Sequence, residues 1–462
     1  MLSIWEGNGQ SDVVQTLNLE ECIAIAMENN FDVKGSRLRS ESSKVNYKQA
    51  RNELLPNLNM NYNLGVNDGR SIDPFTNSYS NQQLTFSNLG ANLNFSFFNG
   101  FRLLNSIKQS RFNMQAAEME LEEAKQDLKL NVTIGYILIL NNRDLVTLAK
   151  SRLEATNAQL NRLKARYDSG AGNPVDYTDM KGQYALDQAA IYDAENRLKF
   201  AVLEFIRLLN IESNGDKDVE NISGLIESGK YQLSAAQIYE EALQNLATFK
   251  AKQFRIDAAE KGIKVAKSDY FPEVSLFGQL NTNYSSLAKT FTETGTSIIE
   301  TTSFVNIANQ DYPVFESQTQ FDGSKINYED QFNNNLNSVV GVSVRVPLFN
   351  GFRAKNNVEL QRVQLEESKL DLENTQLLFK QSIEQAYNNM ETAYNRYYAV
   401  QDQVAAFEES FRVNEVRFNN GVSNIVEYIT SKNNIDNAQL NLNKAKYEYI
   451  LRIKILDYYR GV

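Results

Sequence analysis

Histidine is absent from this chain of 462 residues, and cysteine occurs once. Without histidine the chain lacks the side chain that most often serves as a general base or a metal ligand near neutral pH. The single cysteine, Cys22, cannot form a disulfide within the chain, and the helical pattern around it predicts a buried helix residue. These absences remove the easiest routes to catalysis without excluding it. Because the sequence also offers no convergent catalytic set, we expect no enzymatic activity, no bound metal and no cofactor.

Long hydrophobic runs and clusters of positive charge are also missing. No apolar stretch reaches the ~18 residues of a membrane-spanning helix, and MLSIWEGNGQ at residues 1–10 lacks the apolar core of a signal peptide. If the protein is exported, its signal peptide is absent from this sequence. The formal net charge is -10 and no stripe of lysine and arginine is present, so no nucleic-acid partner is expected.

Residues 57–67, NLNMNYNLGVN, alternate asparagine with large apolar side chains. Successive side chains of a strand point to opposite faces, so this segment has one apolar face and one amide face. Strands of soluble sheets are commonly ~5 or 6 residues long, whereas a strand that crosses a bilayer needs ~9 to 11. The segment therefore favours a strand between lipid and a water-filled lumen.

The chain contains two copies of one unit. The string FNGFR occurs at 98–102 and again at 349–353, an offset of 251 residues. The front ends repeat at an offset of 216, which aligns LLP at 54–56 with YFP at 270–272. A register held over such distances indicates duplication. Because the two offsets differ by 35, the second copy carries about 35 extra residues in its β region.

Each copy is expected to contribute two strands, at 57–67 and 88–98, then at 273–284 and 338–348. The segments within these pairs are long and polar, as in outer-membrane barrels; surface loops of a soluble sheet are the alternative. For the longer loop, 285–335, a partial plug of the barrel mouth and a contact with outside partners both fit the sequence.

A very long helix is predicted between Phe352 and Asn420, where neither glycine nor proline occurs. Apolar residues recur there every seven positions, at Val358, Leu365, Leu372, Phe379, Ala386, Ala393, Val400 and Phe407. At 1.5 Å rise per residue this is a helix of roughly 100 Å, supercoiled against its neighbours.

The long helices of both copies end at similar turns, RYDSGAGNPVDY at 166–177 and RFNNGVSNIVEY at 417–428. The glycine in the middle of each turn suits a C-terminal helix cap. Asn173 and Asn424 then suit the N-caps of returning helices, with an acidic residue at the third helical position as in a capping box. Each copy therefore ends in a long α-hairpin.

The predicted organisation follows from these elements. It consists of an N-terminal extension at 1–16, a first repeat at 17–210 with an α-hairpin at 100–210, an equatorial linker at 211–232, and a second repeat at 233–460 with an α-hairpin at 351–459. Four strands cannot close a membrane barrel, which needs at least eight, and open sheet edges are not tolerated in lipid. The chain must therefore oligomerise; a dimer with 8 strands and a trimer with 12 both fit.

The order of these features resembles the TolC-type outer-membrane efflux protein family. The resemblance rests on the duplicated β-hairpin plus long α-hairpin, the junctions SFFNGFR and PLFNGFR, and tips of the form R-[YF]-x-x-G-x-x-x-x-V-[DE]. It covers about residues 15–460. It implies an α+β membrane protein, a homotrimer whose 12-stranded outer-membrane β-barrel is continuous with a 12-helix periplasmic α-barrel.

The resemblance also implies a function in the outer membrane of a diderm bacterium, with contact to its lipid. The protein would be the passive exit duct of a tripartite efflux or type I secretion system. Small molecules or proteins would reach it from an inner-membrane pump of the RND, ABC or MFS type, through a periplasmic adaptor protein.

By the same resemblance the hairpin tips form a periplasmic gate with acidic rings. The ring candidates are Asp176, Asp179 and Glu427. Phe418, Ser423 and Thr430 stand beside them, where relatives carry a tyrosine, an arginine and in some cases an acid. The departures at Phe418 and Ser423 weaken the case for the same lock. The adaptor is expected to dock on Gly170, Ala171, Gly172, Gly421, Val422 and Ser423.

Two plainer interpretations also fit the sequence. Asp176 and Glu427 also suit a purely capping role, which the helix dipole favours. For the whole chain, the alternative is a non-channel helical tether or scaffold protein of the envelope, with β segments that form a soluble cap. Apolar faces on several strands disfavour a soluble cap, because they would leave a large exposed patch.

Overall fold

The computed structural model describes residues 16–72, 77–212, 218–220 and 229–462. The chain divides into a helical unit of residues 1–47, 109–260 and 363–462 and a β unit of residues 48–108 and 261–362. The predicted N-terminal extension apart from Thr16, and residues 213–217 and 221–228 of the predicted linker, lie outside the described residues.

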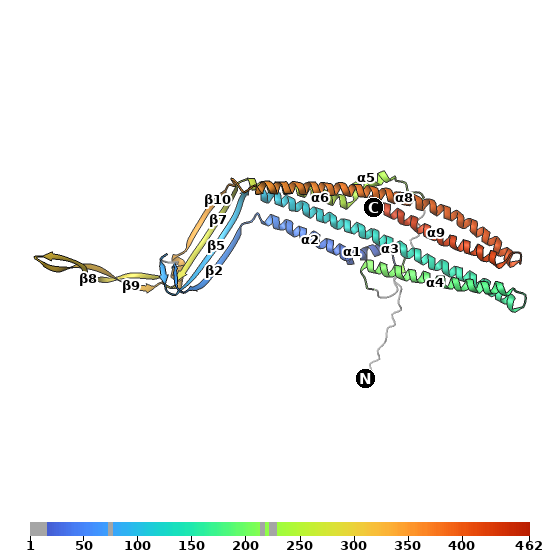
Figure 1. The fold of residues 1–462 in the computed structure, drawn as a ribbon, viewed down its shortest axis with the longest axis horizontal. Coiled ribbons are helices and arrows are strands. Elements are labelled where there is room, and N and C mark those ends of the chain that lie inside the picture. The colour runs from blue at the N-terminus through green and yellow to red at the C-terminus, as the bar shows by residue number, and fades with distance from the viewer. Residues whose placement is uncertain (1–15, 73–76, 213–217, 221–228) are drawn as a thin grey trace, which may run out of the picture. The chain divides into compact units, whose positions relative to one another are not determined.

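Two long α-hairpins form most of the helical unit, and Figure 1 shows α3 beside α4 and α8 beside α9. The first helices, α3 (Arg102–Asp168) and α8 (Arg353–Asn419), have 67 residues each. The returning helices, α4 (Pro174–Leu209) and α9 (Ile425–Arg460), have 36 residues each. The equal lengths reflect the duplication that the repeated sequence strings indicate.

The seven-residue repeat of α8 marks the side of this helix that packs inward. None of its eight residues, from Val358 to Phe407, is exposed, and Val358, Ala386 and Ala393 are buried. The predicted packing stripe is therefore confirmed for this helix.

Each copy opens with a pair of shorter helices: α1 (Leu19–Asn29) and α2 (Phe31–Asn52), then α5 (Ala235–Asn245) and α6 (Ala247–Lys267). The first helix of each pair begins with a capping box. Asn18 pairs reciprocally with Glu21, and Ser234 with Gln237. Such boxes satisfy two of the backbone N–H groups that a helix start leaves unpaired.

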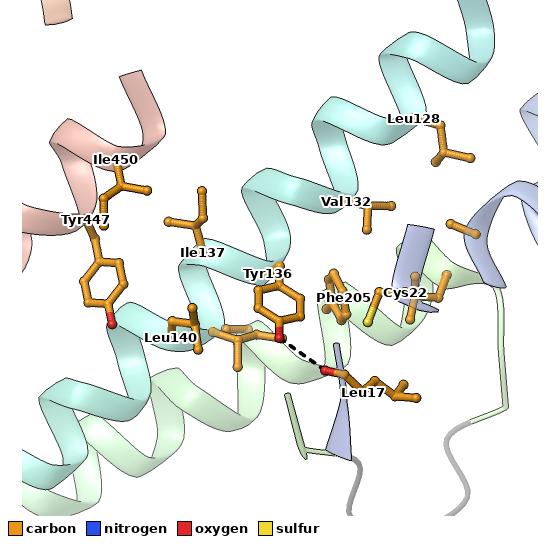
Figure 2. Packing of buried hydrophobic residues seen from close by; sticks show 14 of the residues in the cluster. Leu17, Cys22, Leu128, Val132, Tyr136, Ile137, Leu140, Phe205, Tyr447 and Ile450 are labelled. Carbon is orange, nitrogen blue, oxygen red and sulfur yellow. Dashed lines mark hydrogen bonds between the residues drawn. The ribbon is translucent and has the colours of Figure 1, made fainter. Parts of the chain in front are cut away.

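The core of the first copy centres on Tyr136 of α3 (Figure 2). Its hydroxyl lies 3.2 Å from the carbonyl oxygen of Leu17 and 2.6 Å from that of Glu220. Leu17 belongs to β1 (Thr16–Leu17), which pairs in parallel with β6 (Asp218–Val219). The buried hydroxyl thus fastens this short pair of strands to the long helix.

Cys22 lies in the same core, on α1, with no exposed surface. This confirms the predicted buried helix residue. Burial, and secondarily the charge of Glu21, raises the pKa of its thiol to about 11. The second copy has its own core around Ile383, Met390 and Leu456.

The β unit contains a four-stranded antiparallel sheet in the order β10-β7-β5-β2 (Figure 1). Its strands are β2 (Asn57–Asn67), β5 (Leu84–Asn99), β7 (Glu273–Ser285) and β10 (Asn337–Arg345). β10 ends three residues before the predicted end at 348, and Pro347, which has no N–H to donate, follows it closely. β5 begins four residues before the predicted start at 88, because its first residues pair with the end of β2.

The register of the four strands gives the sheet two contrasting faces, as the alternation in the sequence predicts. Most of the apolar residues lie on one face: Leu58, Met60, Tyr62, Leu64, Val66, Leu89, Ala91, Leu93, Leu276, Leu280, Val340, Val342 and Val344. Amides share the other: Asn57, Asn59, Asn61, Asn63, Asn88, Asn92, Asn94, Gln279, Asn281, Asn283 and Asn337. In these four described strands the only charged residues are Glu273 and Arg345, which oppose each other on the amide face.

The remaining elements of the β unit lie in its loops. They are β3 (Arg70–Ile72) and β4 (Tyr79–Asn81), the long ribbon of β8 (Lys289–Ile307) and β9 (Gln310–Lys325), the short helix α7 (Tyr328–Asn334) and a 3-10 turn at Ser268–Tyr270. The ribbon and α7 occupy the insertion that distinguishes the second copy.

The two FNGFR strings form the same unusual junction between sheet and long helix. Phe101 and Phe352 have positive φ angles of 63° and 58°, and a glycine with positive φ precedes each. Such a conformation costs a non-glycine residue ~1–2 kcal/mol. An edge-to-face contact accompanies it in each copy, between Phe98 and Phe101 and between Phe349 and Phe352, with centroids 5.4 and 5.6 Å apart.

Candidate functional site

The tip of the first hairpin is closed by a glycine cap. Gly170 has φ +76°, and its N–H donates to the carbonyl of Tyr167 at 2.9 Å. The next N–H, of Ala171, reaches back to Arg166 at 3.0 Å. This is the Schellman arrangement, which satisfies carbonyls that a helix end leaves free and which favours glycine at the left-handed position.

The second hairpin repeats the cap. Gly421 has φ +73°, its N–H donates to Phe418 at 3.0 Å, and Val422 donates to Arg417 at 2.8 Å. The predicted C-cap role of both tip glycines is therefore confirmed. The tip residues proposed for docking are largely exposed, with Gly172 and Ser423 half-buried.

The returning helices begin with asparagine caps. Asn173 Oδ1 accepts from the N–H of Val175 at 3.1 Å, and its amide donates to Asp176 Oδ1 at 3.2 Å. Asn424 Oδ1 accepts from the N–H of Glu427 at 2.9 Å, and its amide donates to Glu427 Oε1 at 3.1 Å. Each acid thus binds the side-chain amide of its cap and not the cap's backbone N–H, so the predicted capping box is wrong in this detail.

The three acidic ring candidates differ in their surroundings. Asp176 is half-buried, whereas Asp179 and Glu427 are exposed. Burial, and then repulsion from Asp179, raises the pKa of Asp176, while Arg166 opposes the shift. Among the described residues no hydrogen bond or ion pair joins the two aspartates to Glu427, so a ring would need neighbouring chains.

Phe418 does not stand in a polar lock. It is 6% exposed and packs into an apolar cluster with Leu163, Met180, Ile425 and Tyr428, drawn from both hairpins. Its ring lies 5.0 Å from that of Tyr428, and burial raises the pKa of the tyrosine. Position 418 thus contributes an apolar aromatic contact between the two hairpins.

Ser423 and Thr430, the other two residues beside the predicted gate, form no hydrogen bond or ion pair between the hairpins within the described part of the chain. Ser423 Oγ is buried and has no hydrogen bond within the described part of the chain, and Thr430 is exposed. The polar link lies one step away, where Asn419 Oδ1 accepts from Arg162 at 2.8 Å and from Gln159 at 3.3 Å. This joins the end of α8 to α3.

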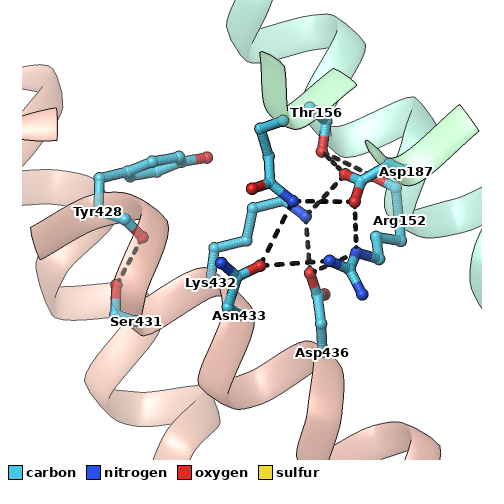
Figure 3. A network of polar contacts seen from close by, with 9 residues as sticks. Arg152, Thr156, Asp187, Tyr428, Ser431, Lys432, Asn433 and Asp436 are labelled. Carbon is cyan, nitrogen blue, oxygen red and sulfur yellow. Dashed lines mark hydrogen bonds and ion pairs between the residues drawn. The ribbon is translucent and has the colours of Figure 1, made fainter. Parts of the chain in front are cut away.

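Beyond the apolar cluster, α3, α4 and α9 are joined by a buried charge network (Figure 3). Arg152 Nε lies 2.7 Å from Asp187 Oδ1 and 2.9 Å from Asp436 Oδ2. Lys432 Nζ lies 3.3 Å from Asp187 and 2.7 Å from Asp436. Two cations thus alternate with two anions, and the set is neutral.

Neutral polar groups complete the network. Thr156 Oγ1 and Gln183 Nε2 both donate to Asp187, and Arg152 donates to Asn433 at 3.2 Å. Asp187 has no exposed side-chain surface and Lys432 has 3%. A buried ion pair is costly to desolvate, so it persists only where such hydrogen bonds satisfy its remaining atoms.

This network was not predicted from the sequence. Lys432 and Asp436 are four residues apart on α9, a spacing that is common for exposed ion pairs and therefore gives no sign of burial. A cavity of about 160 Å³ lies beside it, with Leu145, Ala149 and Leu440 among its apolar lining residues.

Two further properties of the described residues bear on function. No helix among them is sufficiently long and apolar to span a membrane. The same residues include no group of three or more Cys, Asp or Glu side chains placed to hold a metal ion.

The arrangement can be compared with known proteins. The sequence profile described as "Outer membrane efflux protein" matches residues 22–210 and 238–454, which is most of the chain and includes both hairpins. The chain belongs to the outer membrane efflux protein family.

Similarity to individual members of this family extends over nearly the whole chain. Outer membrane protein TolC of Escherichia coli is 22% identical over 451 residues, covering 96% of this chain and 82% of TolC. The efflux protein BepC of Brucella suis is 20% identical over 443 residues, covering 96% of this chain and 84% of BepC. The outer membrane channel CmeC of Campylobacter jejuni has the same fold, with a TM-score of 0.75 at 15% identity over 96% of this chain and 85% of CmeC.

Membership of this family indicates the general function and the cellular location of the protein. It is an outer-membrane exit duct of efflux systems, with an extension into the periplasm. The family consists of channels and not of enzymes. The tip residues described above are therefore candidates for a gate, not for catalysis.

Proposed function

We propose that this efflux protein is a homotrimer that forms a 12-stranded β-barrel and a 12-helix periplasmic barrel. Each chain would supply β2, β5, β7 and β10 to the first and α3, α4, α8 and α9 to the second. The proposal rests on the resemblance to TolC-type proteins and on two features of the chain, the free edges of its sheet and the exposed apolar stripes of two helices.

The sheet of the β unit carries the proposal. Within the described chain β2 and β10 each pair on one side only, which leaves two free edges. Met60 and Val340, on these edge strands, are 76% and 78% exposed on the apolar face. Free edges are not stable in lipid, so pairing of β2 with β10 of a neighbouring chain would close the sheet.

Within the described part of the chain, two helices of the helical unit also lack a partner for part of their apolar surface. α2 exposes Phe31, Leu38 and Val45, and α8 exposes a second apolar stripe at Val363, Leu370 and Leu377, all at seven-residue spacing. Such stripes are seams of supercoiled helices and require a facing helix. A neighbouring copy of the chain would supply it.

The gate of the proposed channel lies at the tips, where Asp176, Asp179 and Glu427 of three chains would form acidic rings. Like charges around a narrow mouth attract cations and repel anions. The tip segments around Gly170 and Gly421 would receive a periplasmic adaptor, which couples the duct to an inner-membrane pump of the RND, ABC or MFS type. The adaptor would shift the channel toward the open state because it would bind the open tips with higher affinity than the closed ones.

The amide face would line the barrel lumen. Because Glu273 and Arg345 are the only charges on that face of the described strands, the β segment would discriminate little between ions. Ion preference would then arise at the helix tips. Cargo, either small molecules or proteins, would be selected by the pump.

Conductance tests the proposal directly. The detergent-purified protein is inserted into a planar bilayer with a salt gradient, and its oligomeric mass is measured in the same detergent. Discrete cation-preferring steps from a trimeric species are expected. A dimer, or protein that inserts but prefers anions, would contradict the proposal, and release from membranes by carbonate would favour the tether alternative.

A further inference from the structure

We propose that α7 (Tyr328–Asn334) lies outside the barrel wall, where it contacts the lipid of the outer leaflet at the level of its headgroups. This inference rests on the proposed function, because it needs a barrel whose apolar face meets lipid. It separates the two roles that the sequence leaves open for loop 285–335, since it places this part of the loop outside the lumen.

The contacts of α7 identify the face of the sheet on which it lies. Tyr328 OH lies 3.3 Å from Tyr62 OH and 3.0 Å from Ser87 Oγ, and its ring centroid is 4.9 Å from that of Tyr284. Thr282 Oγ1 donates to the carbonyl of Phe332 at 2.7 Å. These four side chains belong to one face, because Tyr62 and Thr282 both oppose Leu89, and Tyr284 opposes Ser87.

That face is the apolar one. Tyr62 alternates along β2 with asparagines and shares its face with Met60 and Leu64. A plug of the lumen would instead contact the amide face, whereas Tyr62, Ser87, Thr282 and Tyr284, the sheet side chains that α7 contacts in the described structure, all lie on the apolar face. The helix therefore covers the end of the surface that faces lipid.

A buried glutamine fixes α7 in place. Gln331 is 1% exposed; its amide donates to the carbonyls of Ser285 and Ile326 at 3.0 and 2.9 Å, and its Oε1 accepts from the N–H of Ser285 at 2.9 Å. Asn335 also donates to the carbonyl of Asn283 at 2.9 Å. These bonds satisfy backbone groups at the end of β7, which would otherwise be exposed near lipid.

Along the strands, α7 lies at the level expected for the outer boundary of the apolar band of the barrel. β7 runs from Glu273, at the helical end of the sheet, to Ser285, and Tyr284 is its penultimate residue. Eleven steps of ~3.3 Å correspond to roughly 36 Å along the strand, or about 25 Å of height at a tilt of ~45°. This equals the apolar band of an outer-membrane barrel, so Tyr284 and Tyr328 lie at its far rim.

The composition of α7 suits that level. Tyrosine and phenylalanine rings gather at membrane interfaces, and here the ring of Tyr328 stacks on Phe332 with centroids 4.3 Å apart. Glu329 and Asp330 are exposed on the same helix. Charged groups are tolerated at headgroup level and costly deeper in the membrane, which excludes a position nearer the bilayer centre.

Tryptophan fluorescence in brominated lipid tests the placement. Trp5, the only tryptophan of the chain, is first changed to phenylalanine. The reporter variants are then made in this Trp5→Phe background. Phe332→Trp then reports on α7, Met60→Trp on the apolar face, and Asn63→Trp on the amide face, one residue from Tyr62. The full-length protein is reconstituted in vesicles whose lipids carry bromine either near the headgroup or near the bilayer centre.

The expected pattern distinguishes the inference from the proposed function. Bromine near the bilayer centre should quench the tryptophan fluorescence of Met60→Trp. Phe332→Trp should be quenched more by bromine near the headgroup than by bromine near the centre. Asn63→Trp should be quenched little by either. If Met60→Trp is quenched but Phe332→Trp behaves like Asn63→Trp, α7 lies inside the lumen and the inference is overturned, while the barrel stands. If Met60→Trp is not quenched, the proposed membrane barrel fails and the inference with it. Tyr328→Trp gives a second reading should Phe332→Trp not fold.

Discussion

Lys432 Nζ lies 3.3 Å from Asp187 Oδ2, although the two residues belong to different hairpins and neither side chain is more than 3% exposed. Removing one partner of such a pair leaves the other buried without its counter-charge. The hairpins of one chain are therefore held together by more than the apolar cluster at their tips.

Asp187→Asn is expected to destabilise the helical unit by ~3 kcal/mol or more, because Arg152 and Lys432 then share a single buried carboxylate. Thermal unfolding followed by circular dichroism in detergent measures the loss. Arg412→Gln is the matched control, since Arg412 pairs with Glu409 on the surface and both side chains are more than half exposed. Equal melting curves for the two variants would show that the network contributes no stability.

The double change Asp176→Asn with Glu427→Gln is expected to reduce cation selectivity, because it neutralises two of the three carboxylates that would form the acidic rings. The reversal potential in a salt gradient should move toward zero. Glu409→Gln, an exposed change elsewhere on α8, should leave it unaltered. An unchanged reversal potential in the double variant would refute the assignment of the rings.

Cation selectivity should also depend on pH. The raised pKa of Asp176 means that this carboxylate takes up a proton at a higher pH than an ordinary aspartate, so selectivity should begin to fall early as the pH is lowered. Between the ordinary pKa of an aspartate and the raised pKa of Asp176, the folded state binds more protons than the unfolded state. In this pH interval the contribution of Asp176 to the free energy of unfolding therefore decreases as the pH rises.

Asp179→Asn removes the repulsion that contributes to this shift, so the midpoint of the selectivity loss should move to lower pH. Reversal potentials measured across a pH series test this. A midpoint that stays in place or rises in Asp179→Asn would mean that the neighbouring charge does not act on Asp176.

Gly170→Ala and Gly421→Ala are expected to loosen the tips, since an alanine in the left-handed region costs ~1–2 kcal/mol. Faster amide exchange at residues 171 and 422, which make the Schellman bonds, would report it. Gly182→Ala is the control within α4: its φ is not positive and nothing lies within 4 Å of the added Cβ, so the helix should gain ~0.5–1 kcal/mol. Exchange that slows in all three variants would contradict the cap assignment.

Local patterns in the sequence were sufficient to predict several parts of this fold. The alternation at 57–67 predicts a strand with two faces because the period of a strand is two, and the register bears this out. The seven-residue spacing from Val358 to Phe407 predicts the buried side of α8. In each case the deciding interaction repeats along one element, so that a short window contains it.

Features that depend on contacts between distant segments could not be predicted in this way. The charge network requires α3, α4 and α9 to meet at Asp187, and none of these helices reveals this by itself. The apolar surroundings of Phe418 depend on Met180 of the other hairpin. The placement of α7 depends on Gln331 reaching Ser285, 46 residues away, through a contact for which the sequence has no motif.

The ribbon of β8 and β9 is much longer than β3 and β4, the strands in the corresponding loop of the first copy, whereas the caps of the two tips are nearly the same. In the proposed homotrimer the periplasmic entrance would thus present six almost equivalent tips, an approximate sixfold symmetry, while the outer mouth would carry three ribbons and be strictly threefold. A protein that binds the tips could occupy six sites or three, according to how finely it distinguishes Gly172 from Ser423. One that binds the ribbons would find three.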